Sequence, residues 1–187
     1  FYPSEFLRRT HLELFPTLDP ARQRVVAPEP VATAPARRRA PRNPPRHLAY
    51  VGSVMPHKGA LVFAEVVRRL AEARPAGVRW SVYGGGDEEL LADLRRLPGV
   101  RVRGYYRSGS LPGLLVADEV DLALLLSIVP ESYGFTLSEC RAAGVPVVAF
   151  DLGALGERLL AEGGGRLVPL EAGADGVAAV LSELLAR

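Results

Sequence analysis

The sequence predicts a doubly wound α/β fold, in which helices cover both faces of a parallel β-sheet. From residue 47 onward, short apolar runs alternate with segments of helical periodicity, as in chains built from successive βαβ units. Apolar runs such as 121–126 are too continuous for a half-exposed strand and are typical of strands buried on both faces. Together the two patterns indicate a Rossmann-like sheet, which binds ligands beyond the carboxyl ends of its strands.

The individual elements follow from the same periodicities. Strands are expected at 47–52, 78–83, 100–103, 121–125, 145–150 and 166–169. Helices are expected after them, at 59–74, 87–97, 110–117, 135–143, 153–162 and 173–186. Because each strand is followed by one helix, we expect right-handed crossovers within a single sheet.

The first 46 residues do not follow this alternation and are interpreted as a separate region. A short helix is expected from Ser4, which can cap it, to Phe15, and a Pro- and Arg-rich linker follows at 36–46. Residues 1–50 hold nine arginines against four acidic residues, although the net charge of the chain is only +2. Because no aromatic residues interleave the linker arginines, a solvated linker is favoured over nucleic-acid or anionic-membrane contact. The expected domains are therefore 1–46 and 47–187.

Composition favours a cytoplasmic protein. No apolar run approaches the roughly 20 residues that span a bilayer, and no signal peptide is recognisable. The single cysteine, Cys140, excludes an internal disulfide, suits a reducing compartment and is interpreted as a buried structural thiol. The chain starts at Phe1 without an initiator Met, and we expect it to be a piece of a longer protein.

The most informative segment is 130–139, in which two carboxylates flank the expected start of a helix. Gly134 lets the backbone approach a ligand, and the N–H groups of the first helical turn form an anion site. Glu139 would lie about 6 Å further along the helix axis, where a ribose attached to a bound diphosphate would be. Glu131 precedes the helix and would face the group beyond the phosphates. The pattern indicates a nucleoside diphosphate sugar site, with a helix bearing one capping and one solvated glutamate as the alternative.

Lys58 lies in the loop after the first expected strand and is the only lysine among 23 basic residues. A lysine in so arginine-rich a chain suggests a site that needs a compact point charge rather than a planar fork. Within the loop 52–59 it could neutralise a diphosphate, and His57 beside it could assist. An exposed lysine at a helix start is the alternative interpretation.

Two further loops follow strands and are expected to line the nucleotide pocket. The turn that starts at Gly84 superficially resembles a dinucleotide-binding fingerprint, but Glu89 occupies the position of the third glycine. A tight turn is favoured instead. Gly104 is followed by Tyr105 and Tyr106, which could cover a base by stacking or by backbone hydrogen bonds, with ordinary loop packing as the alternative.

These motifs together resemble the signature of retaining glycosyltransferases of family 4, the group 1 type with the GT-B fold. The resemblance is carried by the pair Glu131 and Glu139 and by the following segment 141–149, RAAGVPVVA, with the loops at 52–59 and 84–86 in the expected order. It covers about residues 47–187 and implies the donor-binding lobe of a two-lobed enzyme. Residues 1–26 look like the last helix of the preceding acceptor domain. The phrasing of 56–59 and 151–158 is closest to bacterial enzymes that build surface polysaccharides.

The resemblance implies a role for each candidate residue. Glu131 would contact the transferred sugar, Glu139 the ribose hydroxyls and Lys58 the diphosphate, which makes Glu131 and Lys58 the catalytic candidates. Many family members carry an arginine where this chain has Ser53, so more of the charge neutralisation would rest on Lys58. The remaining donor-binding candidates are Gly52, Gly84 and Tyr105 and the backbone amides around Gly134, Phe135 and Thr136.

The implied reaction moves a sugar from a nucleoside diphosphate sugar to an acceptor hydroxyl with retention and without an obligatory metal or cofactor. The sequence has no Asp-x-Asp cluster that would contradict this. An acceptor glycan or glycolipid would bind through a missing N-terminal lobe, so this chain alone would be inactive. Peripheral association of the full enzyme with the inner face of the membrane stays open. A GT-B-fold sugar-nucleotide epimerase and a non-enzymatic nucleotide-binding domain are the alternatives.

Overall fold

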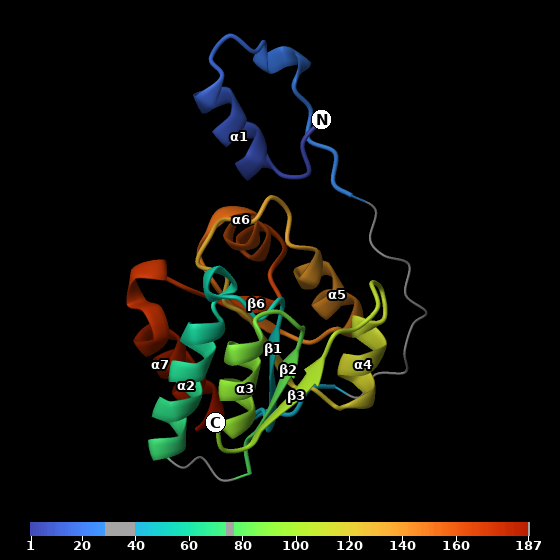
Figure 1. Ribbon diagram of the computed structural model, residues 1–187. Helices are drawn as coiled ribbons and strands as arrows, with labels where there is room; N and C mark the ends of the chain where they lie inside the picture. The colour runs from blue at the N-terminus through green and yellow to red at the C-terminus, as the bar shows by residue number, and fades with distance from the viewer. Residues whose placement is uncertain (29–39, 74–76, 187) are drawn as a thin grey trace.

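The computed structural model describes residues 1–28, 40–73 and 77–186 of the chain. Its centre is a six-stranded parallel sheet with the strand order β3-β2-β1-β4-β5-β6 (Figure 1). Successive strands are added on one side of β1 up to β3, and β4 to β6 are then added on its other side. The order of the strands thus switches between β1 and β4, and sheets of this kind bind ligands at that switch point. The strands are β1 (His47–Val51), β2 (Arg79–Tyr83), β3 (Val100–Gly104), β4 (Leu122–Leu125), β5 (Val147–Phe150) and β6 (Gly165–Val168).

Helices pack on both faces of the sheet. One face is covered by α2 (Ala60–Ala73), α3 (Glu88–Arg96) and α7 (Gly173–Leu185), and the other by α4 (Leu111–Ala117), α5 (Phe135–Ala143) and α6 (Gly153–Glu162). Alternate residues of β1 enter opposite cores: Leu48 and Tyr50 join the core under α2, whereas Ala49 and Val51 join the core under α5. This double burial is the reason why the strand sequences are continuously apolar.

The predicted fold class is confirmed, and the predicted strands and helices occur in the predicted order. The helix expected from residue 59 begins at Ala60, because Gly59 adopts a left-handed φ of 83°. Its expected end at residue 74 lies outside the described residues, as does part of the linker expected at 36–46. Three short 3-10 helices were not predicted: η1 (Pro20–Arg22), η2 (Pro56–Lys58) and η3 (Leu170–Ala172). The division of the chain between residues 46 and 47 stays a prediction.

The first helix, α1 (Glu5–Leu14), lies apart from the sheet and contacts the rest of the chain at α6 (Figure 1). Ser4 caps it as predicted, because its Oγ accepts a hydrogen bond from the Leu7 N–H at 3.2 Å. The same hydroxyl donates to the Ser132 carbonyl at 2.6 Å, and the Glu157 carboxylate of α6 accepts the Glu5 N–H at 3.1 Å. The start of α1 is thus fixed beside the loop that precedes α5.

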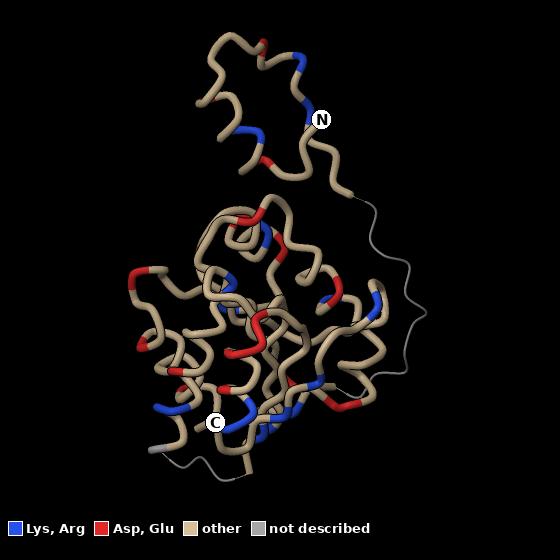
Figure 2. The backbone as a smooth tube through the Cα atoms, in the orientation of Figure 1, with Lys and Arg blue, Asp and Glu red and all other residues tan. Residues whose placement is uncertain are grey.

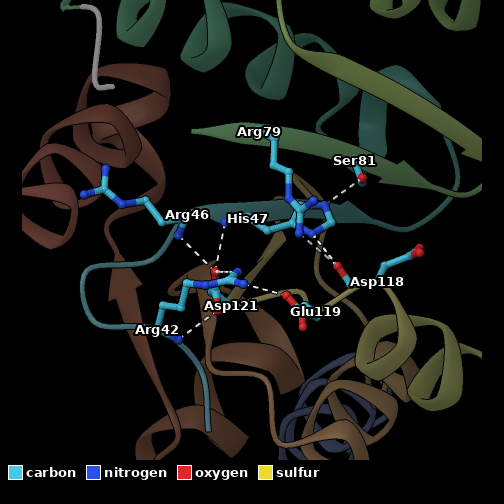
Figure 3. Close-up of polar contacts among 8 residues, drawn as sticks. All are labelled: Arg42, Arg46, His47, Arg79, Ser81, Asp118, Glu119 and Asp121. Atoms are coloured by element: carbon cyan, nitrogen blue, oxygen red, sulfur yellow. Dashed lines mark hydrogen bonds and ion pairs between the residues drawn. The ribbon is translucent and has the colours of Figure 1, made fainter. Parts of the chain in front are cut away.

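A buried carboxylate holds the amino end of the sheet (Figure 3). Asp121, just before β4, is 2% exposed and accepts hydrogen bonds from the N–H groups of Arg42, Arg46 and His47 at 2.8, 3.0 and 3.0 Å. Burial opposes its ionisation, but these hydrogen bonds outweigh that effect and lower its pKa. The carboxylate therefore anchors the stretch before β1 at the end of the sheet where the strands begin. Several basic residues lie near this lower edge in Figure 2, and they are arginines, because the one lysine of the chain, Lys58, follows the carboxyl end of β1.

Two findings bear on the expectations drawn from composition. Cys140 is buried in α5 as predicted, and burial raises the pKa of its thiol. Within the described parts of the chain, no helix has the length and apolar character needed to cross a membrane.

Candidate functional site

The candidate site lies beyond the carboxyl ends of the central strands, where two cavities adjoin. A cavity of about 170 Å³ is lined by the loops after β1 and β4 and by the start of α5. A second cavity, of about 300 Å³, is lined by the loops after β1, β2 and β3 and by a more distant part of α5. Gly52 and Ser53 line both cavities, so the two form neighbouring halves of one site.

The structure brings the predicted site residues together, although their roles in binding stay predictions. Gly134 lines neither cavity but is the N-cap of α5, and His57 is exposed and lines neither. The first cavity contains Lys58, Glu131, Phe135 and Thr136, and the second contains Gly84, Tyr105 and Glu139.

A buried tyrosine shapes the loop that carries Lys58. The Tyr50 ring is fully buried, and its hydroxyl lies 2.8 Å from the Ser53 carbonyl and 2.9 Å from the Lys58 carbonyl. Burial, with a smaller contribution from the Glu131 charge, raises the pKa of Tyr50 and keeps the hydroxyl neutral. One side chain thus joins the two ends of the loop. The loop also requires glycine at position 59, because a Cβ there would lie 1.8 Å from the Leu126 carbonyl oxygen.

The glycine turn after β2 forms part of the wall of the larger cavity, and its contact with a nucleotide stays a prediction. Gly84 has a φ of 145°, and a Cβ there would lie 1.9 Å from the Gly52 carbonyl oxygen. A Cβ on Gly85 would lie 2.2 Å from the Tyr105 ring. The turn is therefore packed against the loop after β1 on one side and against an aromatic ring on the other. Asp87 then caps α3 in the ordinary way, accepting the Glu89 and Leu90 N–H groups.

The start of α5 faces the smaller cavity. Gly134 has a left-handed φ of 80°, and a Cβ at this position would lie 2.4 Å from Leu155 Cδ2. The left-handed φ therefore favours glycine at the point where the chain turns into the helix. Phe135 and Thr136 of the first turn line the cavity, and the backbone N–H groups of a first helical turn have no partner within their own helix. Such groups, with the helix dipole, favour an anion.

Lys58 and Glu131 form an ion pair in the smaller cavity. Lys58 Nζ lies 2.8 Å from Glu131 Oε1, and the two side chains are 30% and 21% exposed. The sequence placed both residues in the site but did not predict that they contact each other, because 73 residues separate them. Among the described residues, no group of three or more His, Cys, Asp and Glu side chains is placed to hold a metal ion.

Glu139 lies in the larger cavity and is 7% exposed. Burial raises the pKa of its carboxyl group, and the hydrogen bond that Oε1 accepts from the Gly109 N–H at 3.2 Å partly offsets this effect. A buried carboxylate that lines a cavity favours a ligand whose hydroxyl groups can donate to it. Glu139 lies about one turn further along α5 than Phe135, and its contact with a ribose stays a prediction.

Arg158 of α6 supports the loop before α5 and was not predicted as a site residue. Its guanidinium group donates to the carbonyls of Tyr133 and Gly134 at 3.2 Å each and to Ser138 Oγ at 3.1 Å. The same group lies 4.1 Å from the centroid of the Tyr133 ring, and the side chain is only 11% exposed. Arg158 therefore fixes both the glycine turn and the first turns of α5. The sequence held no clear signal for this role, because Arg158 lies beside Glu157 and four residues before Glu162, as in an ordinary helical ion pair.

Comparison with known proteins identifies the family of the chain. Residues 45–187 match the family described as glycosyl transferases group 1. A phosphatidyl-myo-inositol mannosyltransferase of Mycolicibacterium smegmatis is 38% identical over 133 residues, which are 70% of this chain and 33% of that protein. The chain therefore belongs to the group 1 glycosyltransferase family, and its match spans a third of the length of this relative.

Solved structures of glycosyltransferases share the fold. A glycosyltransferase from Rickettsia africae aligns with 98% of this chain and 52% of its own, with a TM-score of 0.70 and 19% identity. Anabaena Alr3699/HepE, solved in complex with UDP and glucose, aligns with 73% of this chain and 38% of its own, with a TM-score of 0.57 and 25% identity. The six-stranded sheet with its helices is thus a Rossmann-like lobe of the GT-B type.

Proposed function

We propose that this chain is the donor-binding lobe of a retaining glycosyltransferase of family 4 and that it binds a nucleoside diphosphate sugar. One observation supports the proposal most strongly: a lysine and the start of a helix adjoin one site, with a carboxylate in each half. Lys58 and the first turn of α5 line the smaller cavity with Glu131, and Glu139 lines the larger cavity. A diphosphate needs the cation and the helix amides, and hydroxyl groups on both sides of it need the carboxylates.

In this proposal the nucleoside occupies the larger cavity. Glu139 accepts hydrogen bonds from the ribose hydroxyls, while Gly84 and Tyr105 border the base. The diphosphate lies between Lys58 and the N–H groups of the first turn of α5. The transferred sugar lies beyond it, where its hydroxyls donate to Glu131.

Lys58 has a catalytic task as well as a binding task. Sugar transfer breaks the bond between the anomeric carbon and the diphosphate, so negative charge builds up on the departing group. A cation already placed beside that group stabilises the transition state more than the ground state. With Ser53 where relatives often have an arginine, Lys58 and the α5 amides provide this charge, and the proposal assigns no metal or cofactor to the reaction.

The acceptor and the lobe that binds it are also part of this proposal. The matched region covers only 33% of the mannosyltransferase relative and 38% of HepE, so the remainder of the enzyme is inferred. The name of the relative suggests a mannosyl donor and a lipid acceptor, and the HepE complex suggests UDP and glucose. Because segments 56–59 and 151–158 resemble bacterial enzymes that build surface polysaccharides, we place the full enzyme in cell-surface polysaccharide biosynthesis, at the cytoplasmic face of the membrane. A second lobe holds an acceptor glycan or glycolipid, and a lipid acceptor brings peripheral contact with the membrane.

A thermal-shift panel on the 187-residue chain tests the proposal. UDP, GDP and ADP are compared with each other and with their glucose and mannose conjugates. A nucleotide that binds the folded chain raises its Tm, and calorimetric titration then gives the affinity. We expect one nucleoside diphosphate to bind and this chain alone to transfer no sugar. The proposal is wrong if none of these nucleotides binds.

A further inference from the structure

The ion pair between Lys58 and Glu131 crosses the smaller cavity and joins two loops that are distant in sequence. Lys58 belongs to η2 after β1, and Glu131 to the loop between β4 and α5. The distance of 2.8 Å between Nζ and Oε1 is that of a charge-assisted hydrogen bond. Because the side chains are 30% and 21% exposed, a ligand in the cavity can reach both of them.

The two residues are also the charged groups of this cavity. Among the described residues that line it, Lys58 is the one cation and Glu131 the one acid. The pair therefore leaves the cavity close to neutral. A free nucleoside diphosphate that enters must draw Lys58 away from Glu131, and its charge then lies close to a carboxylate that has lost its partner.

Binding of a sugar-bearing donor leaves Glu131 with a partner, because the sugar hydroxyl groups donate hydrogen bonds to Glu131 when Lys58 turns to the diphosphate. Each charged group then exchanges one partner for another, and neither is left unpaired. After transfer the sugar leaves, and Glu131 again competes with the spent nucleotide for the lysine.

From this balance, and on the basis of the proposed function, we infer that the Lys58–Glu131 pair sets the specificity of the site for sugar-bearing nucleotides over the free nucleoside diphosphate. The pair weakens binding of the spent nucleotide and thereby favours its release. Glu131 is then a specificity-determining residue that acts on the nucleotide through Lys58, in addition to its contact with the sugar.

The distinguishing prediction is that removing the charge of Glu131 strengthens binding of the free nucleotide. Glu131→Gln keeps the size of the side chain but no longer competes for Lys58 as an anion. We expect the affinity of this variant for the best-binding member of UDP, GDP and ADP to rise on the order of fivefold, the effect of a partly exposed ion pair. Affinity for the glucose or mannose conjugate of the same nucleotide should fall, so the ratio of the two affinities should invert or approach one.

Three further variants separate this inference from general effects: Lys58→Met, the same change combined with Glu131→Gln, and Glu139→Gln. In a chain that already carries Lys58→Met, Glu131 has no lysine to compete for. Adding Glu131→Gln to Lys58→Met should therefore give no further gain in nucleotide affinity. Glu139→Gln removes a negative charge from the other cavity and should not strengthen nucleotide binding. Calorimetric titration of all four variants with the same nucleotide gives these values directly.

The outcomes separate the inference from the function on which it rests. If the unmodified chain binds none of the nucleotides, the proposed function and the inference are both wrong. If the unmodified chain binds a nucleoside diphosphate and Glu131→Gln binds it equally well or more weakly, the proposed function stands and the inference is overturned. A gain that persists in the Lys58→Met background also overturns it.

Discussion

The two ends of the parallel sheet use charged groups in opposite ways. At the amino end, Asp121 is 2% exposed and bound by three backbone N–H groups and by the Arg42 side chain. At the carboxyl end, Lys58 and Glu131 are partly exposed and border a cavity. A charge whose hydrogen bonds are made within the protein stabilises the fold, whereas a charge beside a cavity can exchange its partner for a ligand.

His47 shows the same tendency at the amino end (Figure 3). Its ring is 5% exposed, with Nε2 2.8 Å from Ser81 Oγ and Nδ1 2.9 Å from the Asp118 carbonyl oxygen. Burial lowers its pKa, so the ring stays neutral at physiological pH. Burial and hydrogen bonds thus hold Asp121 charged and His47 neutral. The comparison predicts that changes at this end affect stability, while changes at the other end affect binding.

The largest effect should come from Asp121→Ala. The change leaves three N–H groups and the Arg42 guanidinium without their shared acceptor, and we expect a loss of about 3 kcal/mol in the free energy of unfolding. Urea denaturation measures it. Glu119→Ala is the matched control, because Glu119 pairs with the same arginine from an exposed position and should cost less than about 1 kcal/mol. If the folded Asp121→Ala variant binds the nucleotide more weakly than the unmodified chain, the amino end of the sheet also contributes to binding and the division between the two ends is wrong.

The pH dependence of this contribution has a defined sign. The pKa of Asp121 is lowered in the folded chain, so the unfolded chain binds more protons as the pH falls. The stabilisation is therefore complete above the unfolded pKa of about 3.9 and is lost as the pH falls through the lower folded pKa. Urea denaturation of the unmodified chain and of Asp121→Ala should give curves that converge below about pH 4.

At the carboxyl end, the largest effect should follow from Lys58→Ala in the full-length enzyme. We expect a loss of about a hundredfold in kcat and a smaller rise in the KM for the donor, since the interaction strengthens in the transition state. Lys58→Arg should rescue turnover only in part, because a planar guanidinium does not reproduce a compact ammonium group in a tight loop. Near-normal turnover of Lys58→Ala would remove Lys58 from the catalytic site.

The two glutamates should separate nucleotide binding from sugar use. Glu139→Ala should weaken binding of the free nucleoside diphosphate by about tenfold to a hundredfold, the effect of losing hydrogen bonds to a charged group. Glu131→Ala should not weaken it, and should instead impair use of the sugar-bearing donor by the full-length enzyme. Calorimetry and steady-state kinetics measure the two effects. The assignment is wrong if both variants weaken nucleotide binding equally.

Arg158 sharpens the comparison because it is a nearly buried charge that belongs to the binding end. Arg158→Ala should lower nucleotide affinity by about tenfold, since the carbonyls of Tyr133 and Gly134 lose their donor and the first turn of α5 loses its alignment. Arg166→Ala is the matched control, because Arg166 forms an exposed pair with Glu183. Equal affinities of the two variants, measured by calorimetry, would show that Arg158 has no positioning role.

The fold was largely predictable because its signals are local. The double burial of each strand gives a continuous apolar run, and helices between such runs leave few other arrangements. Most of the candidate site was predictable for a related reason, since parallel strands bring the loops at their carboxyl ends together. Lys58, Glu131 and Glu139 could thus be assigned to one site although they lie on different loops and a helix.

The partnerships between distant residues were not predictable. Asp121 was placed at the start of a strand, but its role depends on Arg42, which is 79 residues away and reaches it only through the tertiary fold. Arg158 is likewise 24 residues from the Gly134 carbonyl that it binds. Neither contact has a spacing that marks it in a single sequence.

The most direct test of the division between the two ends is an NMR titration of the ¹⁵N-labelled chain with the nucleoside diphosphate that it binds best. Backbone amide signals of Gly52, Phe135 and Thr136 should shift most, because these residues line the cavity where the diphosphate is proposed to lie. Signals of Arg42 and His47 at the amino end should stay unchanged. Large shifts confined to the amino end, with the signals of Phe135 and Thr136 unaffected, would contradict the proposed site.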